Sequence, residues 1–129
     1  EIYQLISGTK KSIHLEKFLK FPKNFENKKL NDKWIELIKI RDKCNISIEE
    51  KRASKEIGSS LEANLNIKIN KKFKDLFENI DFSELCITSK ANVDFGDASE
   101  VEILTKKMQG KKCSVCWKIS PETCARHPE

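Results

Sequence analysis

The strongest constraint on the fold is a strict alternation of apolar and polar residues over positions 61–70. Leucine, alanine and isoleucine occupy the odd positions, whereas glutamate, asparagine and lysine occupy the even ones. Successive side chains of a β-strand point to opposite faces of a sheet, so this pattern predicts a strand with one buried and one solvated face. Such a strand needs a second element to cover its apolar face.

A long helix is predicted directly before that strand. Asn31 and Asp32 are good N-cap residues, and the helix is expected to run from them to about Ser54, with Gly58 closing the helical region. Apolar residues recur along it at intervals near three and four: Trp34, Leu37, Ile38, Cys44 and Ile48. This helix is the element expected to cover the strand.

The remaining elements are shorter. A helical stretch is predicted over 71–79, and two further strands over 85–93 and 101–105, separated by a turn-prone DFGDAS sequence. The expected fold class is therefore α+β, with one long helix packed on a small three-stranded antiparallel sheet. Residues 1–6 read as the last turn of a helix that ends at Ser7 and Gly8.

The charge is unevenly distributed along the chain. The formal net charge is +5, and residues 1–60 carry 14 basic and 9 acidic side chains whereas residues 61–129 carry 11 of each. A basic excess of this kind favours a polyanion partner, although a solvated lysine-rich surface gives the same count. No apolar run approaches the length that a membrane span requires.

Five cysteines divide into two groups. Cys44 and Cys86 stand alone in apolar stretches and are expected to be small buried side chains, whereas the other three cluster near the end of the sequence. Cys113 and Cys116 form a C-x-x-C pair, a spacing that lets two thiolates reach one tetrahedral zinc ion. A thioredoxin-like redox role is disfavoured because the βαβ setting is missing.

Zinc needs two more ligands beside this pair. Cys124 and His127 are candidates within the sequence, and a second C-x-x-C pair beyond Glu129 is the other possibility. Trp117 follows the C-x-x-C pair, and Lys118 lies beside it. The Trp117 ring either fills the apolar interior of a small metal-binding module or stacks on an unpaired base.

Three cations of the long helix and its exit are candidate RNA contacts. Arg41 and Arg52 are separated by about three helical turns, so both point to one side, and Lys55 follows. The alternative is a set of intrahelical ion pairs such as Glu49 with Arg52. No glycine-rich phosphate loop and no persuasive catalytic arrangement is present in the sequence.

Several stretches together resemble bacterial isoleucyl-tRNA synthetases, which are class I aminoacyl-tRNA synthetases. The resemblance rests on Trp34, Leu37, Arg41, Asn45, Glu49, Arg52 and Lys55, and on 1–4 (EIYQ), 12–15 (SIHL), 57–63 (IGSSLEA), 86–93 (CITSKANV), 110–117 (GKKCSVCW) and 127–128 (HP). It covers nearly the whole chain. One departure is that Cys124 falls where that family does not usually place a ligand, so the resemblance leaves Cys113 and Cys116 as half of a zinc site.

The resemblance implies a domain order and a function. Residues 1–29 would be the end of a helical anticodon-binding domain and a connector, 30–109 a long helix with an α+β junction domain, and 110–129 a partial zinc-ribbon-like module. The parent enzyme would activate isoleucine with ATP and Mg²⁺ and charge tRNA(Ile), in the cytoplasm and as a monomer. This stretch lacks the ATP-site signatures, so it would recognise tRNA on the anticodon side and catalyse nothing alone.

The resemblance also assigns residues and leaves alternatives. Arg41, Arg52 and Lys55 would contact the tRNA backbone, and Trp117 and Lys118 would lie on the anticodon side. The main alternative is a free-standing zinc-ribbon module that binds RNA. A purely structural helix-plus-sheet domain with incidental thiols is the third reading.

Overall fold

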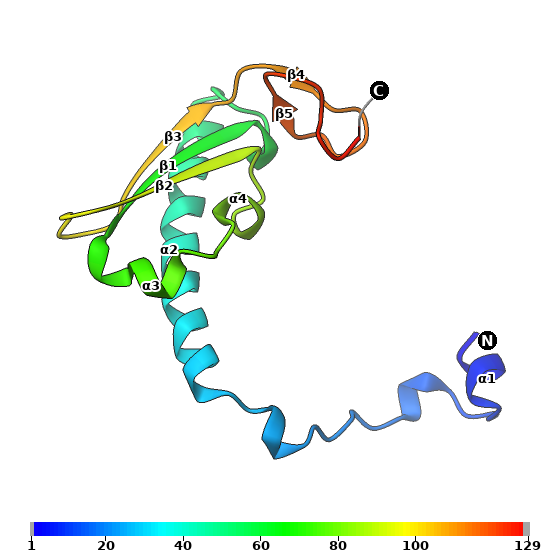
Figure 1. Cartoon of the computed structure of the whole chain (residues 1–129). Coiled ribbons are helices and arrows are strands. Elements are labelled where there is room, and N and C mark those ends of the chain that lie inside the picture. The colour runs from blue at the N-terminus through cyan, green and yellow to red at the C-terminus, as the bar shows by residue number, and fades with distance from the viewer. Residues whose placement is uncertain (1, 128–129) are drawn as a thin grey trace.

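The computed structural model describes residues 2–127, which divide into an extended N-terminal segment and an α+β body (Figure 1). The segment begins with helix α1 (Ile2–Ser7), which ends at Gly8 with a φ of 66°. Glycine adopts this left-handed conformation without steric cost, so the predicted helix end is confirmed. Two single 3₁₀ turns follow, η1 (Ile13–Leu15) and η2 (Lys23–Phe25).

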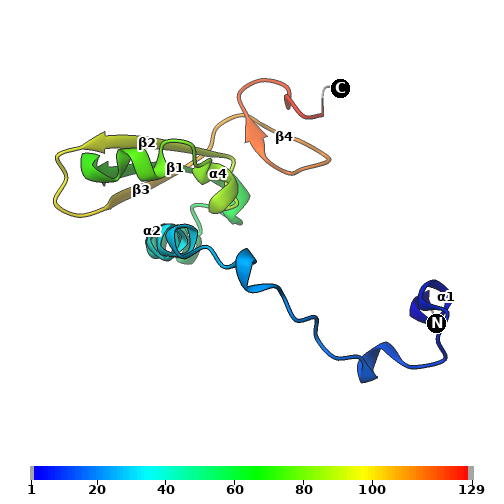
Figure 2. The ribbon, with the colours of Figure 1, turned by 60° about the horizontal axis from the view of Figure 1, so that its bottom comes forward.

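The aromatic side chains of this segment do not reach the core of the body. Phe18, Phe21 and Phe25 are 102%, 75% and 69% exposed. Figures 1 and 2 show the segment running away from the sheet. These three aromatic rings therefore do not attach the segment to the core of the body.

The predicted long helix is confirmed as α2 (Lys28–Ala53), a helix of 26 residues. It starts a few residues earlier than predicted because Asn27 is the N-cap, and its Oδ1 accepts a hydrogen bond from the Leu30 N–H at 3.0 Å. At 1.5 Å per residue the helix is about 39 Å long. Its buried residues lie on one stripe: Leu37, Ile40, Cys44 and Ile48.

The sheet has three strands in the order β2-β1-β3, so the first strand is central. The strands are β1 (Ala63–Asn70), β2 (Lys90–Gly96) and β3 (Glu102–Lys107). The α+β class is confirmed, but the expected fully antiparallel sheet is not. β1 pairs with β3 antiparallel and with β2 parallel, which makes the sheet mixed.

The parallel pair follows from the connection between β1 and β2. That connection contains η4 (Lys71–Phe73), α3 (Lys74–Phe77) and α4 (Phe82–Leu85), and parallel strands require a crossover of about this length. The strand predicted over 85–93 starts only at Lys90 because Asp81 caps α4, accepting a hydrogen bond from the Ser83 N–H at 2.8 Å.

The core lies between α2 and one face of the sheet. All four inward side chains of β1 are at most 1% exposed: Ala63, Leu65, Ile67 and Ile69. Phe77 packs edge-to-face on Phe82, with ring centroids 6.3 Å apart. Cys44 and Cys86 are both buried, as predicted. Burying one large aliphatic side chain contributes about 1.5–3 kcal/mol, so this layer is the main source of stability.

A small hairpin follows the sheet. Its strands are β4 (Lys111–Lys112) and β5 (Ile119–Ser120), which pair antiparallel. Lys107 at the end of β3 pairs with Ala63 at the start of β1, so the hairpin leaves the sheet at the end where α2 delivers the chain into β1. No helix within residues 2–127 is long and apolar enough to cross a membrane.

Candidate functional site

The hairpin brackets the C-x-x-C pair and depends on one glycine. Gly110 has a φ of +139°, and a Cβ atom at this position would lie 2.1 Å from the Ser120 carbonyl oxygen. The knuckle is closed by two backbone hydrogen bonds, from the Cys113 N–H to the Lys118 carbonyl and from the Trp117 N–H to the Cys113 carbonyl, each 3.0 Å long. The close strand approach at Gly110 therefore brings the two ends of the knuckle together.

Three cysteine thiols and one histidine ring converge at this knuckle. Cys113, Cys116, Cys124 and His127 place one ligand atom each within 4.8 Å of one another. Cys116 Sγ lies 3.7 Å from Cys124 Sγ, and His127 Nδ1 lies 3.7 Å from Cys113 Sγ. In a tetrahedron with Zn–S bonds of about 2.3 Å the ligand atoms are about 3.8 Å apart. The donor set and its spacing therefore fit a four-coordinate zinc ion.

The electrostatics of the cluster favour metal-binding protonation states at two cysteines. Backbone N–H groups of Cys116 and Val115 lower the pKa of the Cys113 thiol to about 6. The backbone N–H of Arg126 lowers the pKa of the Cys124 thiol. Hydrogen bonding to Cys124 and Cys113 raises the pKa of His127, so protons compete with a metal for this ring.

The sequence leaves two possible sources for the remaining zinc ligands, and the geometry favours the one within the chain. Cys124 and His127 complete a set of four with Cys113 and Cys116, so a second C-x-x-C pair is not needed to saturate one zinc ion. All four side chains are half-buried. A closed set of four protein ligands is typical of structural zinc, because catalytic zinc keeps one position for water or substrate.

Trp117 and Lys118 differ in how accessible they are. Trp117 is 59% exposed, and Lys112 Nζ lies 5.5 Å from the centre of its ring. Lys118 is half-buried, and its Nζ donates to Glu84 Oε1 at 2.6 Å. The ring is therefore available to a stacking partner, whereas the ammonium group is held against α4.

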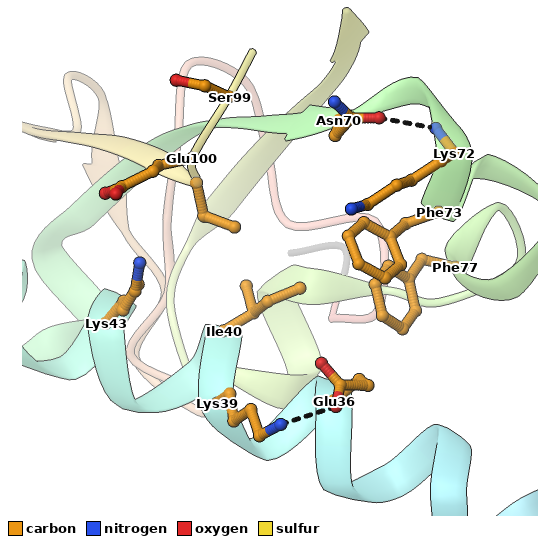
Figure 3. Close-up of a pocket in the computed structure, with 11 residues that line it drawn as sticks. Glu36, Lys39, Ile40, Lys43, Asn70, Lys72, Phe73, Phe77, Ser99 and Glu100 are labelled. Carbon is orange, nitrogen blue, oxygen red and sulfur yellow. Dashed lines mark hydrogen bonds and ion pairs between the residues drawn. The ribbon is translucent and has the colours of Figure 1, made fainter. Parts of the chain in front are cut away.

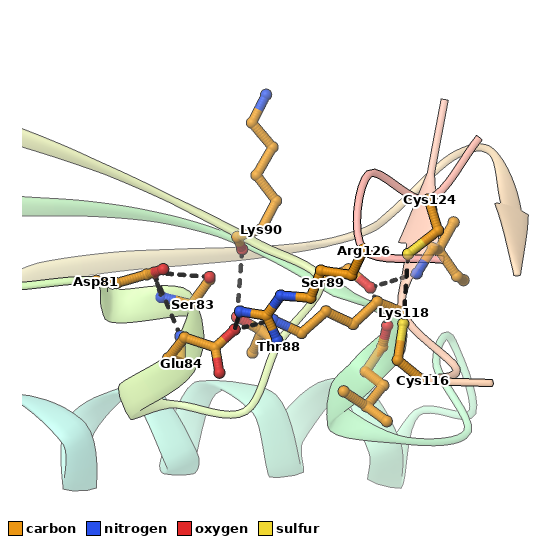
Figure 4. A network of polar contacts seen from close by, with 12 residues as sticks. Asp81, Ser83, Glu84, Thr88, Ser89, Lys90, Cys116, Lys118, Cys124 and Arg126 are labelled. Carbon is orange, nitrogen blue, oxygen red and sulfur yellow. Dashed lines mark hydrogen bonds and ion pairs between the residues drawn. The ribbon is translucent and has the colours of Figure 1, made fainter. Parts of the chain in front are cut away.

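A carboxylate on α4 and a serine before β2 attach the hairpin to the body (Figure 4). Glu84 Oε1 accepts hydrogen bonds from Lys118 and, at 2.9 Å, from Arg126 Nη2. Ser89 Oγ accepts from the Ile119 N–H at 2.6 Å and donates to the Leu61 carbonyl. Sequence reasoning missed Glu84, Ser89 and Arg126, because no local pattern links residues that are 30–42 positions apart.

The three cations of the helical region are not equivalent. Arg41 is half-buried, and its Nε donates to the Leu85 carbonyl at 3.0 Å. Arg52 pairs with Glu49 at 2.7 Å, as one reading of the sequence proposed. Lys55 is exposed in a left-handed conformation with a φ of 60°. Arg52 and Lys55 line one shallow cavity at the end of α2, whereas Arg41 is directed to α4.

A separate cavity of about 350 Å³ lies between α2 and the segments that flank the far end of the sheet (Figure 3). Ile40, Phe73 and Phe77 form its apolar wall, and Lys72 Nζ lies 4.9 Å from the centre of the Phe73 ring. Its lining among the described residues contains no cysteine or histidine. The cavity therefore offers no thiol or imidazole for nucleophilic or metal chemistry.

Comparison with known proteins found similarity to isoleucine–tRNA ligases of several bacteria. The chain is 57% identical over 129 residues to isoleucine–tRNA ligase of Pelagibacter ubique (strain HTCC1062), a match that covers 100% of the chain. It is 34% identical over 111 residues, 86% of the chain, to isoleucine–tRNA ligase of Zymomonas mobilis subsp. mobilis (strain ATCC 31821 / ZM4 / CP4). With the ligase of Gluconobacter oxydans (strain 621H) it shares 30% identity over 124 residues, 95% of the chain. No family model matches.

These matches confirm the resemblance for a defined part of the relatives. The chain spans 14%, 12% and 13% of the length of these three ligases. It is therefore homologous to a stretch of bacterial isoleucine–tRNA ligases.

Proposed function

We propose that this chain, a homologue of part of the bacterial isoleucine–tRNA ligases, is the part of such an enzyme that contacts tRNA(Ile) on its anticodon side. The observation that carries the proposal is the 57% identity over all 129 residues to one such ligase. An enzyme of this kind would act in the cytoplasm and as a monomer. The free-standing zinc-ribbon RNA-binding module is the competing reading.

Zinc would have a structural role in this proposal. Cys113, Cys116, Cys124 and His127 would hold the ion, and the bound ion would cross-link the knuckle to the last described turn. A hairpin with two-residue strands buries too little apolar surface to be stable alone, so metal binding would supply its folding free energy. No reaction step is assigned to the zinc.

The exposed ring of Trp117 would supply the anticodon-side contact. Aromatic side chains stack on unpaired bases of RNA loops, and each stack contributes about 1–3 kcal/mol. Arg52 and Lys55 at the end of α2 would contact phosphates. Arg41 and Lys118 would act mainly by holding the site together, because both already donate hydrogen bonds within the body.

The rest of the ligase chain would supply catalysis and cover the N-terminal segment. Activation of isoleucine with ATP and Mg²⁺ would take place on other parts of the enzyme, and this stretch alone would be inactive. The exposed apolar side chains of residues 13–25 support a covering partner, since a contiguous apolar segment in water is unfavourable. We assign that role to the remainder of the synthetase.

The test is direct binding of tRNA to the zinc-loaded chain. Fluorescence anisotropy would compare labelled tRNA(Ile) with a tRNA of another anticodon, using the wild-type chain and Trp117→Ala. We expect preference for tRNA(Ile), and a roughly ten-fold loss for Trp117→Ala, which corresponds to one lost stack. Equal binding of both tRNAs would favour the free-standing RNA-binding module, and no binding would reject the proposal.

A further inference from the structure

The outward face of the sheet carries an ordered set of polar side chains. Strand register places these residues in three rows across β2, β1 and β3: Lys90–Asn64–Lys106, Asn92–Asn66–Leu104 and Asp94–Lys68–Glu102. The opposite face packs on α2, as Figure 2 shows. The side chains of the three rows are exposed or half-buried, so this face is accessible to a partner.

The first two rows are rich in asparagine, a residue that strands disfavour. Asn64 and Asn66 lie on the central strand, and Asn92 lies beside them on β2. The Asn92 amide donates to Asn66 Oδ1 at 3.0 Å and lies 3.4 Å from Asn64 Oδ1. Asparagine is depleted in strands, and each amide offers both donors and an acceptor. Three amides in contact on an open face therefore suit a partner that is itself rich in polar groups.

The charge of this face changes from one row to the next. In the third row Lys68 pairs with Glu102 at 3.5 Å, and Asp94 adds a further negative charge. In the first row Lys90 and Lys106 flank Asn64, and within residues 2–127 neither lysine forms an ion pair. Free positive charge is therefore concentrated at one end of the face.

The first-row end of the sheet adjoins residues 110–127, which carry the zinc-ligand side chains and are here called the zinc-ligand module. Lys90 lines a cavity of about 340 Å³ together with Lys118, Arg126 and residues of the hairpin. Figure 4 shows Lys90 directed away from the Glu84 ion pairs, on the sheet side of the same junction. Its neighbour Ser89 anchors the hairpin through the Ile119 N–H. The Lys90 end of the first row therefore lies beside the hairpin.

We propose that the face formed by Asn64, Asn66, Lys90, Asn92 and Lys106, here called the lysine–asparagine face, binds the sugar–phosphate backbone of RNA. The inference rests on the proposed function and identifies a tRNA-contacting surface outside the helix and the knuckle. The two lysines neutralise phosphates, and the amides hydrogen-bond to 2′-hydroxyl and phosphate oxygens. The mixed charge of the third row marks the limit of the surface.

The experiment compares two double variants, each of which removes two positive charges from one end of the sheet. The test variant is Lys90→Gln/Lys106→Gln, and the matched control is Lys68→Gln/Lys71→Gln, whose lysines pair with Glu102 and Asp97. Affinity of the zinc-loaded full chain for tRNA(Ile) is measured by anisotropy from 50 to 200 mM salt. Each lost phosphate contact reduces the slope of log K against log salt by about 0.7–0.9. We therefore expect the test variant to lose about 1.5 of the slope, and the control to lose almost none.

The outcomes separate this inference from the proposed function. If the wild-type chain binds tRNA(Ile) and the test variant keeps the same salt slope, the lysine–asparagine face is overturned as an RNA-binding surface and the proposed function stands. Equal losses in both double variants also overturn it, since general charge would then explain the effect. If the wild-type chain binds no tRNA, both proposals fail. A third variant, Asn64→Asp, is expected to lower affinity at least ten-fold, because it places a carboxylate between Lys90 and Lys106 in the first row.

Discussion

Arg126 and Glu84 lie 42 positions apart in the sequence and meet in an ion pair of 2.9 Å between Nη2 and Oε1. The same carboxylate oxygen accepts from Lys118 Nζ at 2.6 Å. Lys118 follows the C-x-x-C pair, and Arg126 lies between Cys124 and His127. A single glutamate of α4 therefore contacts both loops that carry the zinc-ligand residues. The contact lowers the pKa of Glu84, chiefly through Lys118.

Replacing Glu84 should increase the internal motion of residues 110–127 without releasing the zinc ion. In Glu84→Gln both ion pairs lose their charge, while all four ligand residues remain, so we expect one zinc ion per chain and faster internal motion of residues 110–127. Backbone ¹⁵N relaxation measures the motion, and metal analysis measures the zinc. Glu78→Gln is the matched control, because its ion pair with Lys74 is exposed and 4.0 Å long. Identical relaxation in both variants would contradict this role of Glu84.

Gly110 should be essential for the metal site although it ligates nothing. In Gly110→Ala the new Cβ would overlap the Ser120 carbonyl at 2.1 Å, so the β4–β5 pair must open. We expect cobalt affinity, read from the thiolate charge-transfer band, to fall at least ten-fold. Gly96→Ala is the control, since no atom lies within 4 Å of the added carbon. Retained affinity in Gly110→Ala would show that the hairpin tolerates another backbone path.

Arg41 and Arg52 should separate stability from RNA binding. Arg41→Met removes a half-buried charged donor from the Leu85 carbonyl, and such bonds contribute about 1.5–3 kcal/mol. Arg52→Met removes only an exposed pair with Glu49, for which about 0–1 kcal/mol is typical. Urea denaturation should therefore reveal a clear loss of unfolding free energy for Arg41→Met alone, with the tRNA affinity of Arg52→Met reduced. Equal stability losses would refute the distinction.

The cap of α4 should give a pH-dependent contribution to stability. Hydrogen bonding, first from the Ser83 hydroxyl, lowers the pKa of Asp81 from its ordinary value of 3.8. A carboxyl whose folded pKa is lowered stabilises the fold above its unfolded pKa, and this contribution is lost as the pH falls through the folded value. At pH 7 Asp81→Ala should lower the unfolding free energy by about 1 kcal/mol.

The pH test compares the wild type with Asp81→Ala and Asp81→Asn, all without zinc. The difference between wild type and Asp81→Ala should narrow as the pH falls below 3.8. Asp81→Asn keeps a capping oxygen without a titrating charge, so its difference from Asp81→Ala should not depend on pH in this way. If the difference in unfolding free energy between wild type and Asp81→Ala stays constant down to pH 2.5, the charge of Asp81 contributes nothing to stability.

Local periodicity made much of the fold predictable from the sequence. The helix α2 and the strand β1 each repeat their apolar residues with one period over many positions, and such patterns depend only on neighbours in the chain. The C-x-x-C pair and the nearby Cys124 and His127 were recognisable because these residues also lie close together in the chain. In β1 the odd positions from Ala63 to Ile69 are buried, as the alternation required.

Strand pairing and the attachment of the hairpin were not predictable in this way. Whether β2 runs parallel to β1 depends on the crossover between them. The Asp81 cap that begins α4 lies between the helical stretch predicted over 71–79 and the strand predicted over 85–93. The bonds from Arg126 to Glu84 and from Ile119 to Ser89 join segments brought together only by the folded sheet. The single sequence carries no signal for such distant pairs.

The central claim is that this stretch supplies tRNA recognition to an isoleucine–tRNA ligase that performs catalysis elsewhere. The most direct measurement uses the Pelagibacter ubique ligase, which is 57% identical over the matched stretch. Three forms are compared: the intact enzyme, a form lacking the matched stretch, and a form in which this chain replaces it. Isoleucine-dependent ATP–pyrophosphate exchange and charging of tRNA(Ile) are measured for each. We predict that the truncated form keeps exchange but loses charging at least ten-fold, and that the replacement restores charging. Normal charging by the truncated form, or a replacement that exchanges but does not charge, would contradict the claim.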